Sequence, residues 1–137
     1  MQFRSPPGSL YRGVHGLIVV FSIFDRMSFN NVGEWVKEFN RYIRQGSHPV
    51  IVIVGNKMDR ADSRVVTVEE ANAKATELGA IAYIETNCVS GEGVDQVFEC
   101  ITQKLLQSDP KWVQVAREKR KALQQGKSEI NQPCTMQ

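Results

Sequence analysis

The chain has 137 residues, of which 42% are hydrophobic, so it is long enough for one modest domain with a single packed core. Its net charge of +2 is unevenly placed, because six Lys or Arg residues against three acidic ones fall between Asp109 and Gln137. Three widely spaced cysteines without a C-x-x-C pair do not indicate a disulfide framework or a zinc site, and no apolar run approaches the roughly 20 residues that span a bilayer.

Two strands and one helix are predicted in the first half of the chain. Residues 17–24 (Leu-Ile-Val-Val-Phe-Ser-Ile-Phe) and 50–54 (Val-Ile-Val-Ile-Val) are β-branched and aromatic runs of strand length. Between them, apolar residues recur at spacings of three and four from Phe29 to Ile43. This pattern predicts one amphipathic helix, with Gly46 at the C′ position that ends it. Residues 1–13 are expected to be irregular.

The second half of the chain continues the alternation. Thr67-Val-Glu-Glu70 is a capping box that begins a helix, and residues 80–84 (Ala-Ile-Ala-Tyr-Ile) form a third apolar strand. Another amphipathic helix is predicted from Val94 to Leu105. After it we expect a short helix over residues 112–123 and then a polar, disordered end. Strands that are apolar on both faces and alternate with helices predict an α/β fold, with a parallel sheet covered by helices.

Polar residues follow the second strand, where an open α/β sheet binds its ligands. The segment is Asn56-Lys57-Met58-Asp59. Guanine presents its N1–H and N2–H to one edge, and a single carboxylate such as Asp59 accepts both, whereas adenine offers an acceptor there. Such a contact discriminates by about 1–3 kcal/mol. Asn56 can bind the other edge of the base, and the Lys57 stem can lie along its face. The alternative is an ordinary Gly-Asn turn.

Three segments keep a common order over residues 9–107. Tyr11-Arg-Gly-Val-His-Gly16 precedes the first strand, Val54-Gly-Asn-Lys-Met-Asp59 ends the second, and Glu85-Thr-Asn-Cys-Val-Ser-Gly91 ends the third. Together they resemble the Rab branch of the Ras superfamily of small GTPases. The resemblance implies a partial Ras-like P-loop GTPase fold, doubly wound, with three parallel strands and flanking helices. It also implies GTP or GDP with Mg²⁺ as cofactors, Rab-type effectors and regulators as partners, and a role in vesicle and membrane traffic.

The same resemblance assigns a guanine-binding set. Asn56 and Asp59 would bind the base, Lys57 would cover it, and the backbone N–H of Cys88 would meet the guanine O6. Asn87-Cys88-Val89 stands where the family has Ser-Ala-Lys. Val89 therefore takes the place of a second stacking lysine and completes the set without its charge. No residue is assigned as catalytic or as a metal ligand.

The sequence contains no G-x-x-x-x-G-K-[ST] phosphate loop and no D-x-x-G segment. These segments supply the phosphate grip and the magnesium ligands in phosphoryl transfer, so we expect little GTP binding and no useful hydrolysis by this chain alone. One interpretation is an incomplete chain of a Rab-like GTPase, from a truncated gene model or a splice product. The alternative is a pseudo-GTPase or adaptor that binds protein partners without nucleotide hydrolysis. In the family another strand lies beside residues 17–24, so we expect an open apolar edge there that oligomerises or binds a partner.

We divide the chain into a small-GTPase part, residues 1–108, and a basic variable tail, residues 109–137. Cys134-Thr-Met-Gln137 fits a C-a-a-X box whose final Gln favours farnesylation. One lipid on Cys134 and a basic cluster at residues 117–121 are the two signals that stable membrane anchoring needs. We expect a cytoplasmic protein, at the cytoplasmic face of membranes if prenylated, and no nucleic-acid partner. The alternative for the basic tail is a solvated helix end.

Overall fold

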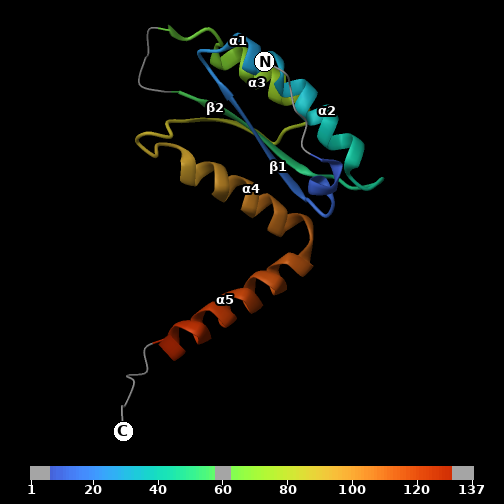
Figure 1. The fold of residues 1–137 in the computed structure, drawn as a ribbon, viewed down its shortest axis with the longest axis vertical. Helices are drawn as coiled ribbons and strands as arrows, with labels where there is room; N and C mark the ends of the chain where they lie inside the picture. Colours follow the sequence, from blue (N-terminus) through green and yellow to red (C-terminus); the bar gives the residue numbers. More distant parts are fainter. Residues whose placement is uncertain (1–6, 58–62, 131–137) are drawn as a thin grey trace.

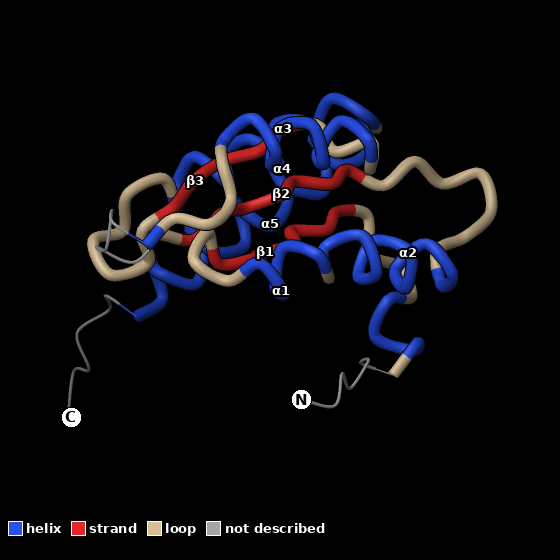
Figure 2. The backbone as a smooth tube through the Cα atoms, turned by 90° about the horizontal axis from the view of Figure 1, so that it is seen from above, coloured by secondary structure: helices blue, strands red, loops and turns tan. Residues whose placement is uncertain are grey.

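A computed structural model describes residues 7–57 and 63–130 of the chain, and its centre is a parallel sheet (Figure 1). The strands are β1 (Gly16–Ser22), β2 (Val50–Asn56) and β3 (Ala82–Thr86), in the order β1-β2-β3. Figure 2 shows β2 between the other two strands. Because β2 is buried from Val50 to Gly55, it reads in the sequence as an uninterrupted apolar run. The predicted α/β fold with three parallel strands and flanking helices is confirmed.

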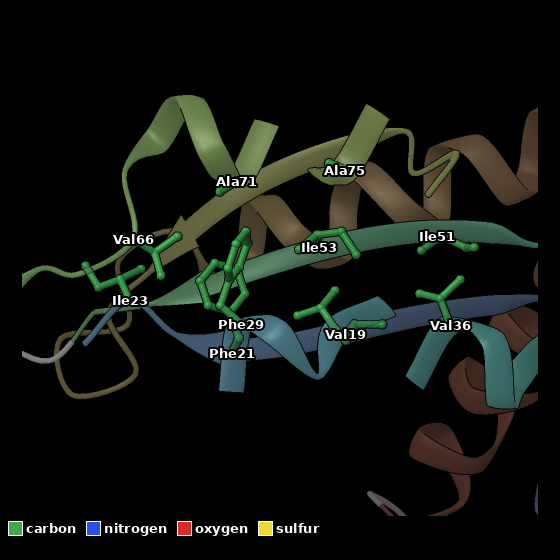
Figure 3. Packing of buried hydrophobic residues seen from close by; sticks show 11 residues of the cluster. Val19, Phe21, Ile23, Phe29, Val36, Ile51, Ile53, Val66, Ala71 and Ala75 are labelled. Carbon is green, nitrogen blue, oxygen red and sulfur yellow. The ribbon is translucent and has the colours of Figure 1, made fainter. Parts of the chain in front are cut away.

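Helices cover both faces of the sheet. On one face lie α1 (Arg26–Asn30), α2 (Val32–Tyr42) and α3 (Val68–Glu77), and the other face is covered by α4 (Val94–Ser108). Figure 3 shows the core on the first face, where alternate side chains of β1 and β2 meet the helices. The second core is smaller and consists of the buried residues Val50, Val52, Val54, Ile84, Val97 and Ile101.

The helix predicted from the periodicity of residues 29–43 is two helices, and its end was placed wrongly. The Asp25 carboxylate accepts hydrogen bonds from the N–H groups of Met27 and Ser28, which begins α1 before the predicted stripe. α2 ends at Tyr42, because the next residue is extended. Gly46, with φ 81°, lies in a later turn instead of at the C′ position of the helix.

The chain end that the sequence analysis treated as a short helix is the long helix α5 (Pro110–Ile130), which leads away from the sheet (Figure 1). The Asp109 carboxylate accepts a hydrogen bond from the Lys111 N–H at 2.9 Å, and Pro110 occupies the first helical position. Residues 124–130 are helical, so the expectation of disorder is wrong for them. Residues 131–137 lie outside the described part of the chain.

Two further expectations can be compared with the structure. The capping box is confirmed, since Thr67 and Glu70 exchange side-chain to backbone hydrogen bonds at the start of α3. Of residues 1–13, which were predicted to be irregular, the structure describes residues 7–13, and there η1 (Gly8–Tyr11) forms a 3₁₀ turn whose Tyr11 ring stacks on Tyr42 of α2. None of the helices in residues 7–57 and 63–130 is both long and apolar enough to cross a lipid bilayer.

Candidate functional site

The carboxyl ends of the three strands align at one edge of the sheet. Ser22 of β1, Asn56 of β2 and Thr86 of β3 are neighbours in the strand register. Beyond the last register pair, the Lys57 N–H donates to the Thr86 carbonyl at 2.7 Å. The start of the segment after β2 is therefore attached to β3, as the parallel topology requires for a site shared by two strand ends.

The structure brings together two of the residues assigned to guanine binding. The Cys88 N–H donates to the Asn56 side-chain oxygen, with an N···O distance of 3.4 Å. Asn56 is half-buried and the Cys88 residue is exposed. Because this hydrogen bond is long, it holds the N–H weakly. A carbonyl oxygen such as guanine O6 could replace the Asn56 oxygen at this donor.

Lys57 lies beside the same loop. Its ammonium nitrogen is 3.7 Å from a carboxylate oxygen of Glu92, and the Lys57 side chain is 35% exposed. This ion pair joins the residue that follows β2 to the loop after β3. Lys57 was predicted to cover the base, whereas Glu92 could not be predicted, because nothing in the sequence indicates that these two residues pair.

Residues 87–92 form a tight loop that presents Cys88. The Asn87 side-chain oxygen accepts hydrogen bonds from the N–H groups of Val89 and Ser90, at 2.9 and 3.2 Å, and Asn87 is only 5% exposed. Its backbone N–H donates to the Glu92 carbonyl. Asn87 therefore closes the loop, a role that its capacity for Asx turns could have indicated. Val89 is 72% exposed, and its assignment to the base remains a prediction.

Gly93 sets the distance between this loop and β3. Its φ is 77°, and a Cβ atom built there would lie 2.3 Å from the Glu85 carbonyl oxygen. Glycine is required at this position because a side chain would collide with the backbone of Glu85. A positive φ also disfavours any residue with a Cβ. α4 can therefore begin directly against the end of β3.

A partly buried polar network joins Arg64 to β3. One terminal nitrogen of Arg64 lies 2.7 and 2.8 Å from the two carboxylate oxygens of Glu85, and the Tyr83 hydroxyl donates to the same carboxylate at 2.8 Å. Burial, followed by the hydrogen bond to Glu85, raises the pKa of Tyr83. The hydrogen bond to Glu85 also raises the pKa of Arg64. This network attaches the chain after residue 62 to β3.

Asp59, the residue assigned to select guanine, lies outside the described residues, as does Met58. The structure describes Lys57 before this segment and Arg64 after it, and both residues bond to β3. Lys57 bonds to Thr86, and Arg64 bonds to Glu85. Cys134, assigned to lipidation, is also outside the described part of the chain.

The polar groups at this edge fit a purine base better than a metal ion. Asn56 offers an amide, Cys88 a backbone N–H and Lys57 an alkyl stem, which together can bind and cover an aromatic ring with carbonyl and amine edges. Within the part of the chain that the structure describes, no group of three or more His, Cys, Asp or Glu side chains is placed to hold a metal ion. We therefore derive no magnesium-dependent step for this chain.

Comparison with known proteins gives consistent matches. The model of the Ras family matches residues 1–107. Ras-related protein RIC1 of Oryza sativa subsp. japonica is 41% identical over 97 residues, covering 71% of this chain and 46% of the relative. Ras-related protein RABD2c of Arabidopsis thaliana is 40% identical over 101 residues, 74% of this chain and 48% of the relative. GTP-binding protein ypt1 of Schizosaccharomyces pombe is 36% identical over 104 residues, covering 76% of this chain and 50% of the relative. The chain spans about half the length of the curated relatives it matches.

Proposed function

The chain belongs to the Ras family of small GTPases, as a Rab-like member, and from that premise we propose that it carries the guanine-recognition part of a nucleotide switch in membrane traffic. In this proposal Asn56, Lys57, Asp59, Cys88 and Val89 form the base site. Residues 1–108 are the GTPase part and residues 109–137 a variable tail.

The observation that carries the proposal is the contact between Asn56 and Cys88. It joins an amide side chain at the end of β2 to a backbone N–H in the loop after β3, at 3.4 Å. A base inserted between these two strand ends meets a donor from one segment and an amide from the other. The Lys57–Glu92 ion pair supports the proposal, since it holds the lysine beside the loop that carries Cys88.

Specificity for guanine is assigned to the Asp59 carboxylate. A carboxylate that accepts from both N1–H and N2–H favours guanine over adenine by about 1–3 kcal/mol, or roughly 5- to 150-fold in affinity. The absence of a phosphate-loop sequence from this chain makes the base the main source of binding energy. The affinity for GDP should therefore be weak, with little gain from the phosphates.

Equilibrium binding to the purified 137-residue chain tests this proposal. We expect a dissociation constant for GDP well above the micromolar range, weaker binding of ADP, and loss of the preference for GDP in Asp59→Asn. A Ser63→Asn variant, changed at an exposed residue of the same segment, is the control that should keep the preference. Equal responses to GDP and ADP would contradict guanine recognition, and micromolar affinity for GTP would contradict the weak phosphate grip. If the chain binds neither nucleotide, the alternative of an adaptor without nucleotide is favoured.

We also propose that the chain associates with membranes through a farnesyl group on Cys134 and through basic residues of α5, such as Arg117, Arg120 and Lys121. The exposure of these side chains on a helix that leads away from the sheet supports the proposal, because they are accessible to an anionic surface. Intact mass of the protein purified from cells should show one farnesyl group that Cys134→Ser lacks. An unmodified Cys134 would contradict the anchor.

Rab-type effectors and regulators are the protein partners that we expect for this chain.

A further inference from the structure

The backbone of Glu92 is fixed at the end of the loop after β3. Its carbonyl accepts a hydrogen bond from the Asn87 N–H at 2.9 Å, and its N–H donates to the Ser90 hydroxyl at 3.3 Å. The next residue, Gly93, lies against the Glu85 carbonyl without room for a side chain. The loop therefore sets the point from which the Glu92 side chain extends.

The backbone of Lys57 is fixed at the end of β2. Its N–H donates to the Thr86 carbonyl at 2.7 Å, which sets the position of this residue relative to β3. The part of Lys57 that a ligand would still have to order is its side chain, and lysine loses much rotamer freedom when its side chain is held. A group that limits this freedom before a ligand arrives lowers the cost of binding.

Glu92 supplies such a group through its charge. The Lys57 ammonium nitrogen lies 3.7 Å from a Glu92 carboxylate oxygen, which is close enough for an ion pair but too far for a hydrogen bond. The Lys57 side chain is 35% exposed and that of Glu92 68%, so salt screens their attraction. The pair should therefore have a modest effect that depends on ionic strength.

Lys57 has a special place among the residues assigned to the base. Of the five residues in that set, it is the only one with a cationic side chain. Val89, in the same loop as Glu92, is uncharged and offers Glu92 no ionic partner. The nearest acid before Glu92 in the sequence, Glu85, pairs with Arg64 at 2.7 Å. The covering lysine and Glu92 are thus matched to each other.

We propose that Glu92 is a positioning residue for base recognition, which holds the Lys57 side chain beside the loop that carries Cys88 before a guanine base binds. This inference rests on the proposed function, because Glu92 has this role only if Lys57 covers the base. Glu92 itself contacts no ligand. It acts through the Lys57 ammonium group, so its effect disappears when that charge is removed.

Guanosine titrations of the purified 137-residue chain at low ionic strength test this role. Guanosine has no phosphate, so ionic effects on its binding come from the protein. Glu92→Gln keeps the shape of the side chain and removes its charge. We expect it to raise the guanosine dissociation constant about two- to fivefold, the range that an exposed ion pair supports. Equal dissociation constants in the wild type and Glu92→Gln would overturn the proposal.

Asp95→Asn is the matched control for a general change in charge. Asp95 is exposed in the first turn of α4, three residues after Glu92, and its replacement removes the same unit of negative charge. This variant should bind guanosine like the wild type. A loss of affinity equal to that of Glu92→Gln would assign the effect to the general field and overturn the proposal.

A double-mutant cycle separates action through Lys57 from an effect on the loop itself. Lys57→Met keeps an unbranched side chain and removes the ammonium group. In that background, Glu92→Gln should leave the guanosine dissociation constant unchanged, because the interaction that it removes is already absent. A twofold or larger loss that persists in the Lys57→Met background would contradict a role through Lys57.

Ionic strength provides a readout that does not depend on the Lys57 variant. Raising KCl from about 20 to about 500 mM screens the pair, so the wild-type dissociation constant should approach that of Glu92→Gln. A difference that salt leaves unchanged would overturn the proposal. Guanosine binding with the same affinity in every variant would refute the role of Glu92 alone and leave the base site intact. A chain that does not bind guanosine would refute the proposed function and this inference together.

Discussion

Replacement of Gly93 by alanine should destabilise the protein because the loop after β3 depends on close backbone approach. Alanine at a φ of 77° costs about 1–2 kcal/mol. Its Cβ would also lie 2.3 Å from the Glu85 carbonyl oxygen, about 1 Å closer than an ordinary contact, so the backbone must move. Displacements of this kind typically cost another ~1–3 kcal/mol. We expect a loss of about 2–5 kcal/mol in the free energy of unfolding for Gly93→Ala.

Urea denaturation followed by circular dichroism measures this loss, and Gly91→Ala is the matched control. Gly91 lies in the same loop with a φ of 83°, but a Cβ built there has no atom within 4 Å. The control therefore carries only the cost of the positive φ, partly offset by the lower entropy of the unfolded chain. We predict that Gly93→Ala is less stable than Gly91→Ala by at least ~1 kcal/mol, the lower end of the displacement cost. Equal losses in the two variants would refute the argument that contact with the Glu85 carbonyl fixes the loop.

Three other substitutions test the polar contacts. Glu85→Gln removes the carboxylate that binds Arg64, which should lower the free energy of unfolding by about 1–3 kcal/mol in urea titrations; no change would contradict a structural role for the pair. Glu70 has its pKa lowered to about 2, chiefly by its hydrogen bond with Arg26, so its contribution to stability is present above about pH 4.5 and is lost as the pH falls towards 2. The difference in melting temperature between the wild type and Glu70→Gln should therefore shrink over that interval, and a constant difference would argue against this linkage. Asp109→Ala should remove the cap of α5, with a cost to that helix of about 1 kcal/mol, measurable as faster amide exchange in its first turn; unchanged exchange would count against the cap.

The sheet could be predicted because its strands are apolar runs and the central strand, β2, is buried on both sides. An uninterrupted apolar run such as residues 50–54 has few alternatives in a domain of this size. Helix ends were harder, since they depend on local hydrogen bonds. The start of α1 at Asp25 follows from side-chain capping, and the early end of α2 at Tyr42 follows from the extended residue Ile43, neither of which the apolar stripe encodes. The length of α5 was underestimated because its last residues are polar yet compatible with a helix.

The sequence predicts which types of residue form the candidate site, but not the contacts that hold those residues in place. The position of Asn56 after a buried strand, in a parallel sheet, was enough to place it at the ligand-binding edge. The groups that hold the site together come from residues far apart in the sequence, such as Arg64 and Glu85. Their pairing follows from the register of β3 against β2, which pattern analysis does not give. Asn87 was noted as a departure from the family, and its role in closing the loop required the structure.

The most direct test of the base site is the amide resonance of Cys88 during titration with guanosine and adenosine monophosphates. Guanine should compete with the Asn56 oxygen for the Cys88 N–H, so we predict that this resonance shifts progressively with the guanosine nucleotide. Adenosine monophosphate should leave it unchanged, since adenine has an amine where guanine has O6. A Cys88 resonance that ignores both nucleotides, or that responds to both alike, would contradict the account of this chain as a guanine-recognition module.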